Sequence, residues 1–218
     1  MLWISFNGTT SDDYDIVVNR FTPPQKPTKR ETRLVIPGRS GTLTIDDGTY
    51  EDITVTVEMT LRDIDRDQEI KDWLAGSGDL ICSLRPDRKY RASVPSNAVM
   101  SYWAGNLYII KVDFLCHPFQ YEVTPEVLTT PATLYNSSPI DALPLITFTG
   151  SIVVNGVTFT AATELTVDAD AMVIYKYVLG VLTAAGSDLT GDIESLKLVP
   201  GENTITGTAE IQPNWRWL

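Results

Sequence analysis

The stretch Ile53-Thr-Val-Thr-Val-Glu-Met-Thr-Leu61 alternates apolar and polar side chains without a break. An alternation with a period of two places every second side chain on the same face of a strand. We therefore predict a strand over residues 53–61 that buries one face and leaves the other in water, as in an antiparallel sheet. Residues 110–114 alternate in the same way, with Ile110, Val112 and Phe114 as the apolar set.

The second half of the chain carries shorter β signals separated by turn formers. Asn155-Gly156 lies between two apolar runs and predicts a hairpin with a type I′ turn, because both residues tolerate the positive φ that this turn needs. Further strands are predicted over residues 165–167, 172–179, 193–198 and 204–211. Short strands at this spacing are typical of a β-sandwich or a barrel.

One helix is predicted between Asp63 and Gly76. Asp63 or Asp65 can cap its first turn and Gly76 can end its last turn. Acidic residues gather at its start, where the helix dipole favours them. The spacing of three apolar residues predicts a stripe that packs on the sheet, formed by Ile70, Trp73 and Leu74.

Charge is distributed unevenly along the chain. Its 218 residues include 17 Lys and Arg against 28 Asp and Glu, a net charge of −11. Residues 1–121 hold 14 basic and 17 acidic side chains, whereas residues 122–218 hold 3 and 11. Prolines between Thr124 and Pro144 exclude a long helix or a central strand there. We therefore predict two domains, residues 1–121 and residues 122–218.

The composition excludes several classes of protein. A strongly acidic chain does not bind nucleic acid or an anionic membrane through electrostatic attraction. The sequence contains no run of about 18 apolar residues, so it predicts no membrane-spanning helix. The segment Met1–Gly8 has neither the basic region nor the long apolar core of a signal peptide. We expect a soluble protein that is intracellular at synthesis.

The residues suggest no active site. His117 is the only histidine, and because it follows Cys116 on a strand, the two side chains point to opposite faces and suit no shared metal. Asp46-Asp47-Gly48 predicts a turn between two strands rather than a catalytic pair. We expect no catalysis, no metal and no cofactor, with a glycosidase-type carboxylate pair as the open alternative.

The two cysteines allow a second alternative. A Cys82–Cys116 disulfide is compatible with the sequence. Free thiols are the more common state of two cysteines in an unsecreted chain of this size.

A proline-rich basic segment spans residues 20–33, with prolines at 23, 24 and 27 and with Glu31 as its single acid. The glycine-rich run Ile36–Thr42 follows it and precedes a strand, so it has no helix N-terminus to hold phosphate. We interpret the basic segment as an arm that docks on an acidic surface. The alternative is a solvated surface loop.

A series of motifs runs in order along the chain. In the first half these are Ile36-Pro-Gly-Arg-Ser-Gly-Thr-Leu43, Asp47-Gly-Thr-Tyr-Glu-Asp52 before a strand, the helix ending in Trp73-Leu74, and Phe114-Leu-Cys-His-Pro-Phe119. In the second half they are Pro144–Gly150, Asn155-Gly156, Leu165–Asp168, Leu198–Ile205 and the ending Trp215-Arg-Trp217. Together they resemble the distal tail (Dit-like) protein family of siphophages, over nearly the whole chain.

This resemblance implies a mainly β virion structural protein at the distal end of a long non-contractile phage tail. It implies an N-terminal β-sandwich with one short helix and a protruding arm, and a C-terminal β-sandwich that is galectin-like or carbohydrate-module-like. The implied assembly is a hexameric ring that joins the tail tube to the tip or baseplate and lets DNA pass. The implied partners are the major tail protein, a tail-tip protein and receptor-binding or baseplate proteins, with assembly in the host cytoplasm.

A ring needs two different complementary patches on each subunit. We expect one patch to be basic, formed by Arg20, Lys26, Lys29, Arg30, Arg33 and Arg39. Its mate would be the acidic start of the helix, because opposite charges set the register of an interface, and would include Asp63, Asp65, Asp67 and Glu69. The alternative is that both groups are solvated surface.

A carbohydrate-binding module for adhesion to the host surface is the rival interpretation. Its sugar-stacking residues would be drawn from Tyr102, Trp103, Tyr108, Tyr175, Tyr177, Trp215 and Trp217. Tyr175 and Tyr177 share a strand face, and we predict that they belong to the core, because large aromatic side chains are mostly buried.

Overall fold

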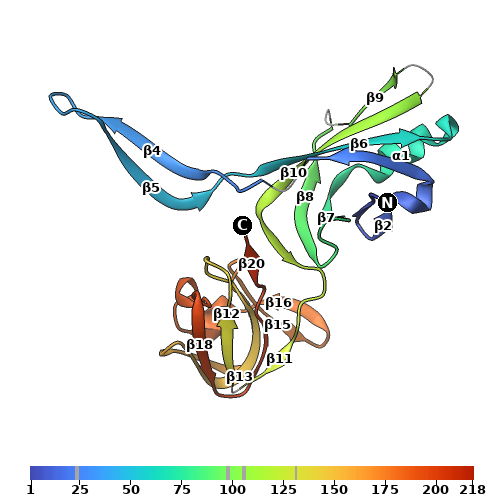
Figure 1. The fold of residues 1–218 in the computed structure, drawn as a ribbon. Helices are drawn as coiled ribbons and strands as arrows, with labels where there is room; N and C mark the ends of the chain where they lie inside the picture. The colour runs from blue at the N-terminus through green and yellow to red at the C-terminus, as the bar shows by residue number, and fades with distance from the viewer. Residues whose placement is uncertain (23–24, 97–98, 105–106, 131) are drawn as a thin grey trace. The chain divides into compact units, whose positions relative to one another are not determined.

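A computed structural model of the chain describes residues 1–22, 25–96, 99–104, 107–130 and 132–218. The structure is mainly β with one short α-helix, which confirms the predicted fold class (Figure 1). It divides into two compact units, Met1–Val123 and Thr124–Trp217. No helix in the described ranges is long and apolar enough to cross a bilayer. Pro23 and Pro24 of the predicted arm lie outside the described residues.

The first unit is built on an antiparallel sheet with the strand order β2-β1-β7-β8-β10-β6-β3, and β9 also pairs with β10. A separate two-stranded sheet is formed by β4 and β5. The strands are β1 Ile4–Phe6, β2 Thr9–Thr10, β3 Ile16–Phe21, β4 Lys29–Val35, β5 Thr42–Tyr50, β6 Ile53–Leu61, β7 Gly76–Cys82, β8 Arg88–Val94, β9 Val99–Ala104 and β10 Leu107–Glu122.

The core of this unit follows the alternation seen in the sequence. In β6 the odd-numbered residues are all buried, and in β10 the residues Ile110, Val112 and Phe114 are at most 1% exposed. The two strands pair over nine residues, with Val57 opposite Val112. Phe6 packs edge to face on Phe114 with ring centroids 5.2 Å apart. The predicted strand over residues 53–61 is therefore confirmed.

The predicted helix is present but shorter than expected. A 3₁₀ turn, Ile64–Arg66, leads into α1, Asp67–Trp73, and Gly76 already belongs to β7. Asp63 caps the turn, since its carboxylate accepts a hydrogen bond from the backbone N–H of Asp65 at 3.1 Å. The predicted stripe does face the core: Ile70 and Leu74 are buried, and the indole of Trp73 donates to the carbonyl of Phe6 at 3.1 Å.

The second unit is a sheet with the order β11-β19-β13-β14-β15-β16, extended by β12, β17 and β18. The strands are β11 Leu128–Thr129, β12 Ala132–Asn136, β13 Leu145–Val154, β14 Val157–Asp168, β15 Val173–Val178, β16 Val181–Ala184, β17 Leu189–Thr190, β18 Gly201–Thr206, β19 Ala209–Gln212 and β20 Arg216–Trp217. Short 3₁₀ turns are found at Ser11–Tyr14 in the first unit and at Gly186–Asp188 and Ile193–Ser195 in the second.

The predicted Asn155-Gly156 hairpin is confirmed. Both residues have positive φ, 50° and 85°, and they join β13 to β14. Two other strand predictions were wrong in detail. Residues 193–198 form a 3₁₀ turn and a single bridge from Leu198 to Ala142. Residues 204–211 break into β18 and β19 at Gly207, whose φ of 99° interrupts the strand.

A network of buried amides ties the strands of the second unit together. Asn203 is fully buried and donates to the carbonyls of Val199 and Gly201 at 2.8 and 3.0 Å. Its own carbonyl accepts from the side chain of Asn155 at 2.7 Å. Asn136 similarly donates to the carbonyl of Leu198 at 3.0 Å. Buried amides of this kind need all their partners, so the network specifies the arrangement of the strands around it.

Candidate functional site

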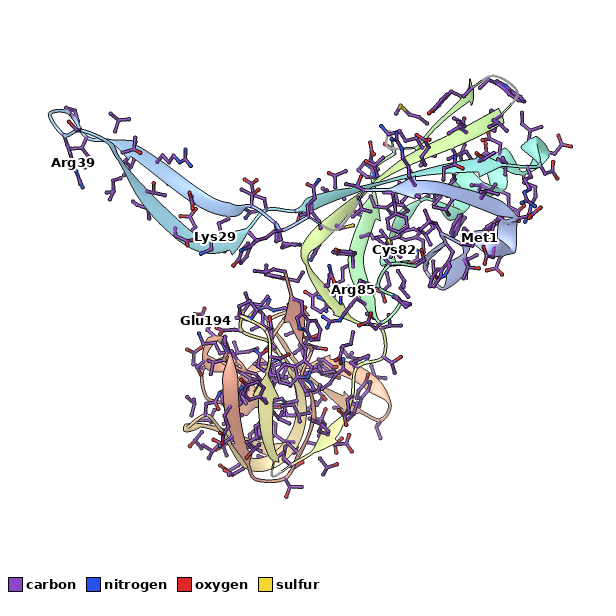
Figure 2. The ribbon with its side chains drawn as sticks, viewed as in Figure 1. Met1, Lys29, Arg39, Cys82, Arg85 and Glu194 are labelled. Carbon is purple, nitrogen blue, oxygen red and sulfur yellow. The ribbon has the colours of Figure 1, made fainter. Side chains whose placement is uncertain are left out.

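The strands β4 and β5 form a hairpin, residues 29–50, which we call the arm. It projects from the sheet of the first unit, with Arg39 at its tip (Figure 2). Residues 28 to 49 are all exposed. Tyr50 anchors the base, because its ring packs edge to face on Phe119 at 5.7 Å. An isolated two-stranded hairpin is marginally stable in water, so the arm gains from a partner that covers it.

The two faces of the arm differ in polarity. Residues opposite each other in an antiparallel pair share a face, and Leu34 lies opposite Leu43 while Thr32 lies opposite Ile45. Leu34, Leu43 and Ile45 are each 39–45% exposed. On the other face Val35 and Arg33 lie opposite Thr42 and Thr44. The first face is therefore an apolar stripe in contact with water, which is typical of a surface that binds another protein.

This apolar stripe was not predicted from the sequence. Only the basic residues of the segment were expected to form a binding surface, and the stretch after them was expected to be a glycine-rich run followed by a strand. The signal was the alternation Thr42-Leu43-Thr44-Ile45, which has the same period as the core strands.

The prediction of a turn at Asp46-Asp47-Gly48 was wrong. These residues lie inside β5, where the ladder to β4 shifts register between the pairs Lys29–Tyr50 and Glu31–Asp46. Gly48 has a φ of 71°, and its N–H donates to the Asp46 carboxylate at 2.8 Å. Asp and Gly suit a bulge for the same reason that they suit a turn, namely a residue with positive φ.

The predicted basic residues fall into two groups. Three of them pair within the first unit: Arg20 with Glu58 at 3.1 Å, Lys29 with Asp46 at 2.6 Å and Arg33 with Glu31 at 3.8 Å. The hydrogen bond between Lys29 and Asp46 raises the pKa of the amine and lowers the pKa of the carboxyl. Among the residues that the structure describes, the side chains of Lys26, Arg30 and Arg39 form no ion pair, and all three are exposed.

The predicted acidic residues are similarly divided. Asp67 pairs with Lys71, four residues later, at 2.6 Å, and Glu69 pairs with Arg66, three residues earlier, at 3.0 Å. The bond from Arg66 lowers the pKa of Glu69. Asp63 caps the 3₁₀ turn, and Asp65 has no ion-pair partner in the described part of the chain. Within that part, no ion pair joins the basic group to the acidic group.

The cysteines and the histidine are not arranged for chemistry. Cys82 and Cys116 are buried free thiols, and burial raises the pKa of each to about 12, which keeps both protonated at neutral pH. Cys116 points inward while His117 is exposed, as expected from their adjacent positions on a strand. The described residues contain no cluster of three or more potential metal ligands.

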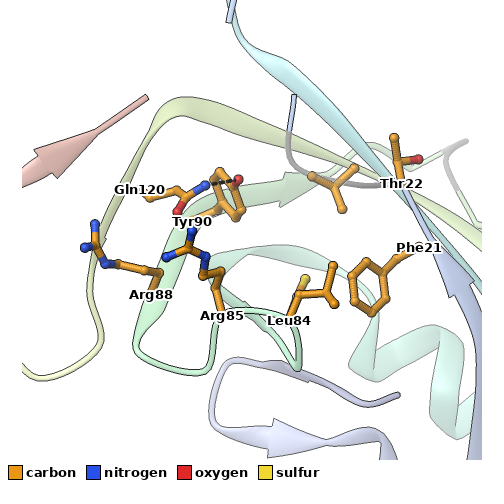
Figure 3. A pocket seen from close by; sticks show the side chains of 9 residues that line it. Phe21, Thr22, Leu84, Arg85, Arg88, Tyr90 and Gln120 are labelled. Carbon is orange, nitrogen blue, oxygen red and sulfur yellow. Dashed lines mark hydrogen bonds between the residues drawn. The ribbon is translucent and has the colours of Figure 1, made fainter. Parts of the chain in front are cut away.

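A pocket in the first unit lies beside Cys82, Tyr90 and Arg85 (Figure 3). Its interior has room for about one water molecule. Gln120 donates to the hydroxyl of Tyr90 at 2.5 Å across its wall. Burial raises the pKa of Tyr90 to about 12, so the phenol stays neutral.

The prediction that Tyr175 and Tyr177 belong to the core was wrong for Tyr177, which is 65% exposed. The two rings meet edge to face, with centroids 6.0 Å apart and planes at 89°. A sugar ring stacks on a flat aromatic face, so a perpendicular pair makes a poor platform. Tyr102 and Trp103 are also exposed, on β9, where Trp103 packs edge to face on Tyr108.

Among solved structures, the chain as a whole is similar to the crystal structure of the Dit protein (gp 19.1) of SPP1. That protein is described as a paradigm of the hub adsorption apparatus of phages that infect Gram-positive bacteria. The two chains are 12% identical, the superposition covers 100% of each, and the TM-score is 0.76. No protein-family model matches the chain, and no curated protein matches it. The chain therefore has the fold of a siphophage distal tail protein along its whole length.

Proposed function

We propose that this chain is a structural component of the adsorption apparatus at the distal end of a long non-contractile phage tail. The observation that carries the proposal is the likeness in fold to SPP1 Dit over the full length of both chains. The proposed role is architectural, in keeping with the description of that neighbour as a hub protein of an adsorption apparatus.

In this proposal, copies of the chain form a hexameric ring between the tail tube and the tip or baseplate. The first unit builds the ring and the second unit faces outward toward tip and receptor-binding proteins. A head-to-tail ring requires two unlike patches on every subunit. The arm supplies one of them, because its apolar stripe of Leu34, Leu43 and Ile45 is uncovered within the chain.

The mate of the arm is assigned to the start of the helix on the next copy. Among the described residues, the basic members without an ion pair are Lys26, Arg30 and Arg39, of which the last two lie on the arm. The acidic members without one are Asp63 and Asp65, before the helix. Opposite charges at an interface set its register more than its strength. The charges would therefore orient the contact, and burial of the apolar stripe would stabilise it.

DNA passes through the ring without being bound. The ring-building half of the chain, residues 1–121, has 17 acidic against 14 basic side chains, and a net negative charge suits this role because it repels phosphate. The site of action is the virion, and the ring assembles in the host cytoplasm with the tail tube protein as one neighbour.

Imaging of the purified protein by negative-stain electron microscopy, together with light scattering after size exclusion, tests the proposal. We expect rings with six-fold symmetry and a mass six times that of one chain. If the chain stays monomeric both alone and when mixed with the tail tube protein, the ring proposal is wrong.

A charge swap tests the partner patches of the ring. Arg30→Glu with Arg39→Glu should weaken the hexamer, since like charges then face each other across the interface. Adding Asp63→Lys and Asp65→Lys to the same chain should restore the hexamer. A matched control is Glu202→Lys in the second unit, an exposed position that should leave the mass unchanged. Hexamers that survive the first swap would contradict this pairing.

A further inference from the structure

The strands β15 and β16 form a second exposed hairpin, residues 173–184, which we call the finger. The ladder between β14 and β15 ends at the pair Thr166–Tyr175, so from Lys176 onward β15 pairs with β16 alone. β16 lies at the end of the strand order of its sheet (Figure 1). The outer half of the finger is therefore a two-stranded extension of the second unit.

The finger is apolar on both faces and at its tip. Tyr177 and Leu182 are opposite each other on one face, and Val178 and Val181 are opposite each other on the other. All four are 45–65% exposed, and Leu179 in the turn is 100% exposed. A soluble surface rarely gathers this many apolar side chains unless another molecule covers them.

The turn of the finger is strained. Leu179 has a φ of 51° and Gly180 a φ of 81°. A left-handed residue with a bulky side chain is uncommon, and Asn or Gly would take this position at lower cost. Because the leucine side chain contacts nothing that would offset this strain within its own unit, a role in contacts with another molecule accounts for it.

The backbone of β16 is open along its outer edge. Ala185 donates to the carbonyl of Ile174 at 2.9 Å, which makes 174 and 185 a hydrogen-bonded pair. Such pairs alternate along an antiparallel ladder. The N–H and C=O groups of Leu182 and Ala184 therefore point away from β15. Natural edge strands are normally blocked by lysine, glutamate or proline, and β16 reads Val-Leu-Thr-Ala.

The charge of the second unit indicates which kind of molecule can bind to the finger. Its cations are already engaged: Lys176 with Asp188 at 2.5 Å, Lys197 with Asp141 at 3.2 Å, and Arg216 with the carbonyl of Asp141 at 2.8 Å. Residues 122–218 hold 11 acids against these 3 bases. The same unit of a second copy would be repelled, whereas a positively charged segment would be attracted.

We propose that the finger binds an extended segment of another protein, which adds a strand to β16. The backbone of the segment pairs with Leu182 and Ala184, and apolar side chains at alternate positions cover Tyr177 and Leu182. Lysine or arginine at the intervening positions matches the acidic unit. This inference rests on the proposed function only in taking the partner to be another tail protein.

Fluorescence anisotropy with synthetic peptides tests the finger. The probe is a labelled peptide of alternating valine and lysine, about eight residues long. We expect it to bind the full chain, while a valine–glutamate peptide and a serine–lysine peptide of the same length do not. If the serine–lysine peptide binds equally well, binding depends on net charge alone and the proposal is wrong. The proposal is also wrong if the valine–lysine peptide does not bind.

Two variants locate the binding to the edge of β16. Ala184→Pro removes an outward N–H without removing a ladder bond, and should weaken binding about tenfold or more through loss of a hydrogen bond and steric block of the edge. Ala184→Val keeps the N–H and is the matched control. Leu182→Asp, which alters an exposed side chain, should also abolish binding, while the same change at Leu34 on the arm should not. Unchanged binding of both finger variants overturns the proposal.

The finger could instead bind the finger of a second copy of the chain, and the Ala184→Pro variant tests this as well. If the chain forms dimers that Ala184→Pro dissolves, the occupant is a second copy and the proposal of a cationic partner is wrong. The peptide assay does not depend on ring formation. Rings without peptide binding would refute the finger alone, and peptide binding by a chain that never forms rings would refute the proposed function alone.

Discussion

The side chain of Asn203 lies in the interior of the second unit with both of its polar ends engaged. Replacing it with Asp turns the donor that faces the carbonyls of Val199 and Gly201 into an acceptor. We expect Asn203→Asp to lower the free energy of unfolding by about 2 to 3 kcal/mol, the cost of leaving buried groups unpaired. Urea denaturation followed by circular dichroism measures this. Glu202→Gln, at the exposed neighbouring position, is the control, and an equal midpoint for both variants would disprove the role of the network.

The thiols of Cys82 and Cys116 predict a loss of stability at alkaline pH. Each has a pKa of about 12 in the folded chain and 9.0 as the reference for an exposed thiol. Between these values the unfolded chain binds fewer protons, so stability falls as pH rises, by up to about 1.4 kcal/mol per pH unit for each thiol. Urea unfolding between about pH 8 and about pH 10 tests the slope.

The matched variant for this prediction is Cys82→Ala with Cys116→Ala. It shifts stability by a constant amount but should show a shallower fall with pH. Tyr90, whose pKa is also raised to about 12, is present in both chains, and its reference pKa of 10.0 places most of its contribution above the pH range of this test. Parallel pH profiles for the two chains would refute the assignment to the thiols.

The indole of Trp73 links α1 to β1 through the carbonyl of Phe6. Trp73→Phe keeps the aromatic contact with Tyr14, whose ring lies 4.9 Å away, and removes the donor. We expect a loss of about 1 kcal/mol in the free energy of unfolding. Trp103→Phe, at an exposed position on β9, should change stability by less. If the two variants lose equal stability, the bond from the indole contributes nothing.

Elements with a long unbroken pattern were predictable from sequence, and those with a broken pattern were not. The strand over residues 53–61 and the hairpin at Asn155-Gly156 each rest on a local rule that the fold obeys. Residues 193–198 contain apolar side chains suitable for a strand, yet Asp192 caps a 3₁₀ turn there. Asp46-Asp47-Gly48 predicted a turn and forms a bulge, because a local preference for positive φ does not determine how far the flanking strands continue.

Each of the two units has a separate hydrophobic core. One core is centred on β6 and β10, and the other on β13 and β14. We expect fragments 1–123 and 124–218 to fold independently, each with a cooperative urea transition and β-type circular dichroism. A fragment that remains unfolded in the absence of the other would contradict this expectation.

The candidate site could be predicted only in part from the sequence. The charges that distinguish the arm from its surroundings are visible in residues 20–39, but the apolar stripe of Leu34, Leu43 and Ile45 is not distinguishable from a core face. The same holds for Tyr177 on the finger. Alternation reveals that a strand has an apolar face, whereas the presence or absence of a covering layer depends on segments far away in the sequence.

The turn at Asn155-Gly156 also determines how fast this site can be chemically modified during storage. Asn-Gly is the dipeptide most prone to spontaneous deamidation, in which the glycine nitrogen attacks the asparagine side chain. Here the amide of Asn155 donates to Asn203 at 2.7 Å and to the carbonyl of Lys197 at 3.3 Å, and its oxygen accepts from the N–H of Thr204 at 3.0 Å. A side-chain amide that is hydrogen-bonded at both ends cannot rotate toward the nitrogen of Gly156. Deamidated Asn155 therefore accumulates only in molecules whose turn has opened. The rate at which it appears during storage reports how often the turn opens.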